Sequence, residues 1–104
     1  MSAELLKSFS YWVEEARPEL VKEGFTVDVS VSPPGRPKPS IGVYLQLGER
    51  GSFLTLWESG ECQLSTVDYA SGSDPVESFC QVGSGDDLKR LLGLALSWSR
   101  GSPT

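Results

Sequence analysis

The sequence predicts one α+β domain of two layers, a four- to five-stranded antiparallel meander covered on one face by N- and C-terminal helices. Three observations support this: an apolar stripe of helical spacing at each end of the chain, alternating apolar and polar residues in between, and short links between the alternating segments. Short links favour antiparallel neighbours, and a sheet with one apolar face needs a helical cover. Since 104 residues suit a single domain, we assign residues 1–104 to it and expect a disordered tail over about 101–104.

The first helix is predicted from Ser2 to about Ala16, because apolar residues recur there at helical spacing. This stripe comprises Leu5, Phe9, Trp12, Val13 and Ala16. Pro18 cannot donate a backbone N–H, so we expect a kink or a fresh helical turn at that point. Gly24 is expected to end the helical region.

The second helix is predicted from about Asp87 to Ser99, with Ser84 and Asp86 as alternative N-cap residues. Its apolar stripe indicates which side packs on the sheet. The stripe comprises Leu88, Leu91, Leu92, Ala95 and Trp98.

Between the helices, apolar and polar residues alternate in segments that predict four or five strands. These segments are 25–31, 41–47, 52–57, 62–69 and 76–82. Segment 52–57 carries apolar side chains on both faces, so we expect it to lie centrally. The sheet face away from the helices is left to solvent or to a partner, and aromatic residues on such a face are typical binding anchors. If the strand faces are inverted, Trp57 is instead a core residue.

The composition argues against several kinds of partner. A formal net charge of −5 and a pI near 4.6 disfavour nucleic acid and anionic membrane surfaces, since both are bound through Lys and Arg. A macromolecular partner is expected to be basic, although mild acidity also serves to keep a small protein soluble.

No apolar run approaches the roughly 20 residues of a membrane span. The N-terminus carries Glu4 and no basic region before an apolar core, which predicts no signal peptide and a cytoplasmic protein.

Residue types that catalyse reactions or bind metals are scarce. There is no histidine, which removes the commonest general base and the commonest metal ligand. Cys62 and Cys80 have no CxxC spacing, and we expect both to be reduced and structural. Glu58 and Glu61 could act as paired carboxylates, but we interpret them as solvated turn acids. We expect no catalytic residue, cofactor or metal; a small enzyme that uses only carboxylates or cysteines is the remaining catalytic alternative.

The segment Trp57–Cys62 joins two predicted strands through a turn at Gly60. Turn chemistry alone explains a glycine there, because glycine adopts the positive φ that many hairpins require. The alternative is a recognition surface, in which stable strands hold a tryptophan flanked by carboxylates. The residues expected to contact a partner are Tyr44 and Trp57 as anchors and Glu58, Glu61 and Asp68 as charged contacts.

The block Leu54–Leu64 resembles the TriTu-type immunity proteins, and Trp57–Cys62 is the specific part of that resemblance. A helix with Phe9 and Trp12, and a proline-containing loop before Ser40, extend the resemblance over roughly residues 5–98. Such proteins are antidotes of bacterial polymorphic toxins, and the type toxin is an ADP-ribosyltransferase that modifies elongation factor Tu. The resemblance implies an immunity protein that binds a cognate toxin domain and covers its active or target-binding site.

The alternative function is a non-catalytic adaptor or regulatory subunit of a bacterial cytoplasmic complex. It shares the acidic surface and the exposed sheet face. A robust protein partner in cells that lack any toxin locus would favour the adaptor.

Overall fold

Two helices flank a five-stranded antiparallel sheet in the computed structural model, which describes residues 2–31, 39–72 and 74–101. The elements are α1 (Ser2–Glu23), β1 (Thr26–Val31), β2 (Ser40–Leu47), β3 (Arg50–Trp57), β4 (Glu61–Asp68), β5 (Val76–Gln81) and α2 (Gly85–Arg100). The strands lie in chain order and each is antiparallel to the next, which confirms the predicted meander with segment 52–57 at its centre. Most of the proline-rich loop and the chain beyond residue 101 lie outside the described residues.

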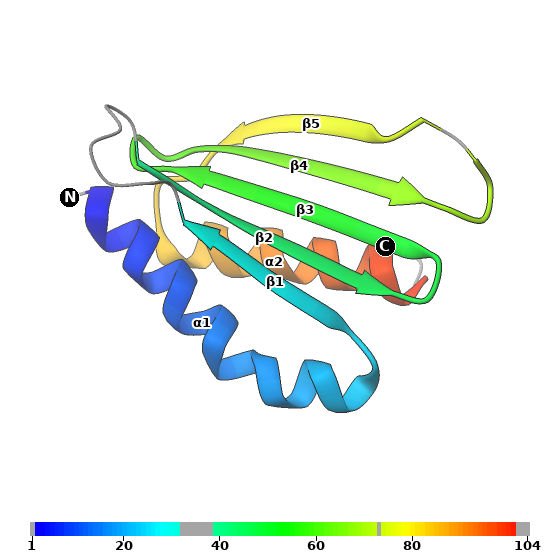
Figure 1. The fold of residues 1–104 in the computed structure, drawn as a ribbon. Coiled ribbons are helices and arrows are strands. Elements are labelled where there is room, and N and C mark those ends of the chain that lie inside the picture. The colour runs from blue at the N-terminus through cyan, green and yellow to red at the C-terminus, as the bar shows by residue number, and fades with distance from the viewer. Residues whose placement is uncertain (1, 32–38, 73, 102–104) are drawn as a thin grey trace.

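Both helices cover the same face of the sheet, and the other face has no helix over it (Figure 1). Residues opposite one another in an antiparallel ladder share a face, so the register Val43–Leu54–Leu64 identifies the covered side. Val43 and Leu54 are almost fully buried. Across the strands the core comprises Val27, Ile41, Val43, Leu45, Leu54, Leu56 and Cys62. The strand faces are therefore as the alternation predicts, and Trp57 is not a core residue of an inverted sheet.

Helix α1 is continuous from Ser2 to Glu23 with Pro18 inside it, so the expectation that the first helix stops near Ala16 is wrong. Its axis bends along its length (Figure 1). A proline in a helix interior costs about 3 kcal/mol. Packing on both sides of the proline offsets this cost, because Val13 and Leu20 are both buried in the core. Gly24 ends the helix as predicted, with φ +112°.

Arg17, next to the proline, ties α1 to the sheet. Its guanidinium donates to the carbonyl of Val27 on the edge strand β1 at 3.0 Å and to the Glu14 carboxylate at 3.0 and 3.1 Å. The contact to Val27 occupies a backbone acceptor of an edge strand, where unpaired groups otherwise invite a second chain.

Helix α2 begins and ends with side-chain and backbone caps. Ser84 is the N-cap, and its hydroxyl accepts from the Asp87 backbone N–H at 3.4 Å, which decides between the two predicted caps. Gly101 closes the helix with φ 76°.

No described helix is long and apolar enough to cross a bilayer.

Candidate partner-binding face

The sheet face away from the helices, called here the open face, is formed by alternate residues of all five strands. Its large side chains are aromatic: Tyr44 on β2, Phe53 and Trp57 on β3, and Phe79 on β5. Phe53 is 42 % and Phe79 73 % exposed, although both lie in regular strands. A single exposed apolar residue is ordinary, but several on one rigid face mark a contact surface.

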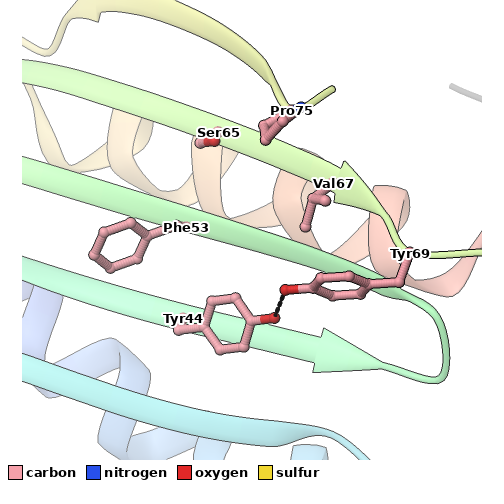
Figure 2. A pocket seen from close by; sticks show the side chains of 6 residues that line it. All are labelled: Tyr44, Phe53, Ser65, Val67, Tyr69 and Pro75. Atoms are coloured by element: carbon pink, nitrogen blue, oxygen red, sulfur yellow. Dashed lines mark hydrogen bonds between the residues drawn. The ribbon is translucent and has the colours of Figure 1, made fainter. Parts of the chain in front are cut away.

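Tyr44, Phe53 and Tyr69 form an aromatic cluster at the middle and one end of the open face. Tyr44 and Phe53 are direct cross-strand partners, with ring centroids 6.5 Å apart and planes at 61°, an edge-to-face contact. Tyr69 follows β4, and its backbone N–H donates to the Glu49 carbonyl at 2.8 Å. Together with Ser65, Val67 and Pro75, these residues line a pocket of about 470 Å³. Figure 2 shows the lining side chains on the near side of the sheet, with the helices behind it.

A chain of hydrogen bonds fixes the two tyrosines. The Tyr44 hydroxyl donates to Gln46 Oε1 at 3.0 Å, and the two tyrosine hydroxyls are 2.7 Å apart (Figure 2). Gln46 Nε2 donates to the Gly48 carbonyl at 3.0 Å, which fixes the orientation of the amide. Because Tyr44 gives its one proton to Gln46, Tyr69 donates to Tyr44. Burial and the bond to Tyr69 raise the pKa of Tyr44 to about 12, so the Tyr44 hydroxyl keeps its proton at neutral pH.

Two glycines lie beneath the aromatic rings, and their lack of a side chain leaves room for the rings. A Cβ atom at Gly51 would come within 2.7 Å of the Tyr44 hydroxyl oxygen, and one at Gly42 within 3.0 Å of the Phe53 ring. Each ring therefore lies across the bare backbone of the neighbouring strand, a known way to cover a glycine in a sheet. The cluster is thus held in one arrangement before any partner binds, which lowers the entropy cost of association.

The charges on the two sides of the sheet differ. The charged residues at open-face positions of the strands are all acidic, and they are Asp28, Glu61 and Glu77. Among the described residues, the basic ones lie on the helices or on the covered face of β3: Lys7, Arg17, Lys22, Arg50, Lys89, Arg90 and Arg100. Several of these already pair with acids of the same layer, as Arg100 does with Glu23 at 2.6 Å. Among the described residues, the open-face strand positions thus carry three acids and no base, which favours the approach of a basic group from this side.

The Trp57–Cys62 segment is a tight connection between β3 and β4, tied to the end of β5. Gly60 has φ +93°, and a Cβ there would lie 2.6 Å from the Val82 carbonyl oxygen, so both its conformation and its close approach require glycine. The Gln81 side chain donates to the Ser59 carbonyl at 3.0 Å. Turn chemistry thus explains the glycine, while Trp57 lies half-buried on the open face at the end of β3, beside the turn.

The five predicted contact residues do not form one patch. Tyr44 lies in the aromatic cluster, whereas Trp57 is four residues beyond Phe53 along β3, or roughly 13 Å at the rise of a strand. Glu58 and Glu61 lie beside Trp57, in the turn and at the start of β4.

Asp68 lies on the opposite side of the sheet from the other predicted contacts. Its carboxylate faces Arg50 at 4.0 Å and accepts from the Ala70 N–H at 3.1 Å. The Arg50 guanidinium in turn lies 4.2 Å from the centre of the Trp98 ring. The structure therefore places Asp68 in the contact between sheet and α2.

The two cysteines are free thiols that lie opposite one another on β4 and β5. Cys62 is buried and Cys80 exposed, and burial raises the pKa of the Cys62 thiol to about 12. A thiol that stays protonated is a weak nucleophile. Within residues 2–31, 39–72 and 74–101, no three acidic or cysteine side chains converge as metal ligands would.

The fold and this surface describe a small α+β domain that offers one rigid, acidic and aromatic face. The family model for the immunity protein TriTu matches residues 7–98, which span most of both helices and the whole sheet. The chain therefore belongs to the TriTu immunity protein family. Membership gives it a toxin-neutralising role and makes a cognate toxin protein its partner. A comparison with curated proteins finds no match.

Proposed function

We propose that the protein neutralises an ADP-ribosyltransferase toxin by binding the toxin domain and occluding its active or target-binding site. Family membership is the observation that carries this proposal. The toxin chemistry comes from the resemblance of Leu54–Leu64 to the type example, whose toxin modifies elongation factor Tu. Neutralisation then takes place in the cytoplasm, where that target is found, and needs no catalytic residue or cofactor.

The open face is the surface that we assign to this contact. It combines exposed aromatic rings, which dominate interface energetics, with carboxylates that attract a basic partner and speed association. A standard interface buries about 800 Å² on each partner. A contact that spans the open face from the aromatic cluster to Trp57, Glu58 and Glu61 is consistent with an interface of that size. Asp68 then acts indirectly, because it supports the sheet from the other side.

The direct test is a reconstituted reaction. The toxin domain encoded beside this gene is incubated with NAD and elongation factor Tu, and ADP-ribosylation is measured while the protein is titrated in. Occlusion predicts that the ADP-ribosylation rate falls linearly with added protein and reaches zero at one molecule of protein per molecule of toxin. Full inhibition at a small fraction of one equivalent would contradict occlusion and indicate catalysis. Absence of inhibition and of co-purification would overturn the toxin assignment.

Order of addition provides the control. When the protein is added after elongation factor Tu has been modified and the toxin removed, an occluding inhibitor leaves the modification in place. Loss of the ADP-ribose group under these conditions would show that the protein acts on the product instead of the toxin.

A further inference from the structure

We propose that the pocket between Tyr44, Phe53 and Tyr69 receives a basic side chain of the partner protein, an arginine or a lysine. This inference rests on the proposed function, which supplies the partner, and it adds the chemistry by which that partner is recognised. Three features of the pocket suit a cation carried on a long aliphatic stem, and they disfavour an acidic group.

The first feature is the hydrogen-bonding capacity that the tyrosine hydroxyls still have. Tyr44 gives its proton to Gln46, and Tyr69 gives its proton to Tyr44. Both protons are thus used inside the protein, and the remaining lone pairs can only accept. The Ser65 hydroxyl on the pocket wall can rotate to accept as well. Arginine and lysine are the side chains that donate without accepting, so they match this set.

The second feature is the aromatic lining. Cations are attracted to the faces of Tyr and Phe rings within about 6 Å of the ring centre. Phe53 and Tyr69 remain 42 % and 51 % exposed, so their rings are available to a side chain that enters the pocket. Val67 and Pro75 add an apolar wall against which the aliphatic stem of a long basic side chain can pack.

The third feature is the local field. Asp28 is the cross-strand partner of Tyr44, and its negative charge adds to the effect of burial and of Tyr69 in raising the pKa of the Tyr44 hydroxyl. With the charges at the open-face strand positions all acidic, a cation entering the pocket approaches through an attractive field. An acidic side chain would meet this field and the acceptor lone pairs together, and both disfavour it.

The first experiment needs no toxin. The full chain with isotope-labelled tyrosine is titrated with N-acetyl-arginine amide and with N-acetyl-citrulline amide, which has nearly the same shape without the charge. We expect the Tyr44 and Tyr69 ring signals to shift saturably with the arginine compound, and the citrulline compound to bind about tenfold more weakly. Tyr11 on α1 is the internal control and should not shift. No saturable shift with arginine, or equal binding of citrulline, would overturn the proposal.

The second experiment uses the toxin domain encoded beside the gene. We expect Tyr69→Phe to weaken toxin binding about tenfold, because it removes a hydroxyl that accepts from a charged donor. Asp28→Asn should slow association, whereas Glu19→Gln, which removes the same charge from exposed α1, should not. If the toxin binds Tyr69→Phe and Asp28→Asn as tightly and as fast as wild type, the basic-anchor proposal fails and the proposed function stands. If wild type does not bind the toxin at all, the proposed function fails and the arginine titration alone decides the pocket chemistry.

Discussion

Replacing Phe53 with alanine separates binding from folding, because its chain neighbour Leu54 provides a matched control. Phe53 lies on the open face and keeps 42 % of its surface exposed, whereas Leu54 faces the helices and is 1 % exposed. The two residues share a strand and a backbone environment. They differ in the side of the sheet that they face.

The burial of each side chain sets the expected loss of stability. Fully burying a large apolar side chain contributes about 1.5–3 kcal/mol, so the roughly half-buried Phe53 contributes about 1–2 kcal/mol. Truncation there opens to solvent and leaves no enclosed cavity. Leu54→Ala removes a fully buried side chain from beneath α2 and should cost about 2–5 kcal/mol.

For binding the order of the two variants reverses. Phe53→Ala should lose about 2 kcal/mol of toxin affinity, or roughly thirtyfold, as expected for an aromatic residue at the centre of an interface. Leu54→Ala should bind as wild type at a temperature where it is folded. Urea denaturation gives the free energies of unfolding, and calorimetric titration with the toxin domain gives the affinities. Equal toxin affinity of wild type and Phe53→Ala would refute the assignment of the interface to the open face.

Three further predictions concern single side chains. Trp57→Ala should weaken toxin binding by about 2 kcal/mol and lower the melting temperature less than Leu54→Ala does; the reverse order would give Trp57 a mainly structural role. Thiol counting on the denatured, unreduced protein should find two free thiols, and in the native protein Cys80 should alkylate much faster than the buried Cys62, whose pKa is about 12. Since the folded pKa of Tyr44 is about 12 and its ordinary value is 10, its contribution to stability should be complete below pH 10 and lost as the pH rises towards 12; the free energies of unfolding of wild type and Tyr44→Phe should therefore differ by a constant amount below about pH 10, and this difference should shrink above it.

The fold could be predicted largely because local patterns and long-range packing agree in this chain. The alternation of apolar and polar residues along each strand predicts which of its sides is buried. Gly24 and Ser84 mark the end of α1 and the start of α2, because helix caps depend on residues that are close together in the sequence. Pro18 is the exception, because its effect depends on tertiary contacts. The buried Val13 and Leu20 on either side of it hold the chain helical at a point where local propensity alone predicts a break.

The candidate site was harder to predict because the pocket combines residues from four separate segments. Alternation along β4 places Val67 and Tyr69 on the same face as Tyr44, a signal that the sequence contains and that our prediction did not use. The role of Gly51 beneath the Tyr44 ring depends on the register between β2 and β3, which the sequence alone leaves undetermined. Asp68 was expected among the partner contacts, but the alternation along β4 places it on the covered face of the sheet, where its carboxylate lies 4.0 Å from Arg50.

The three tyrosines offer the most direct measurement of the central claim, that the toxin domain binds the open face. Tyr44 and Tyr69 lie on that face, and Tyr11 lies exposed on α1. Ring signals of the isotope-labelled protein are recorded before and after one equivalent of toxin domain is added. We expect the Tyr44 and Tyr69 signals to shift and the Tyr11 signal to keep its position. A shift of Tyr11 with Tyr44 and Tyr69 unchanged would place the toxin on the helical layer and contradict the account.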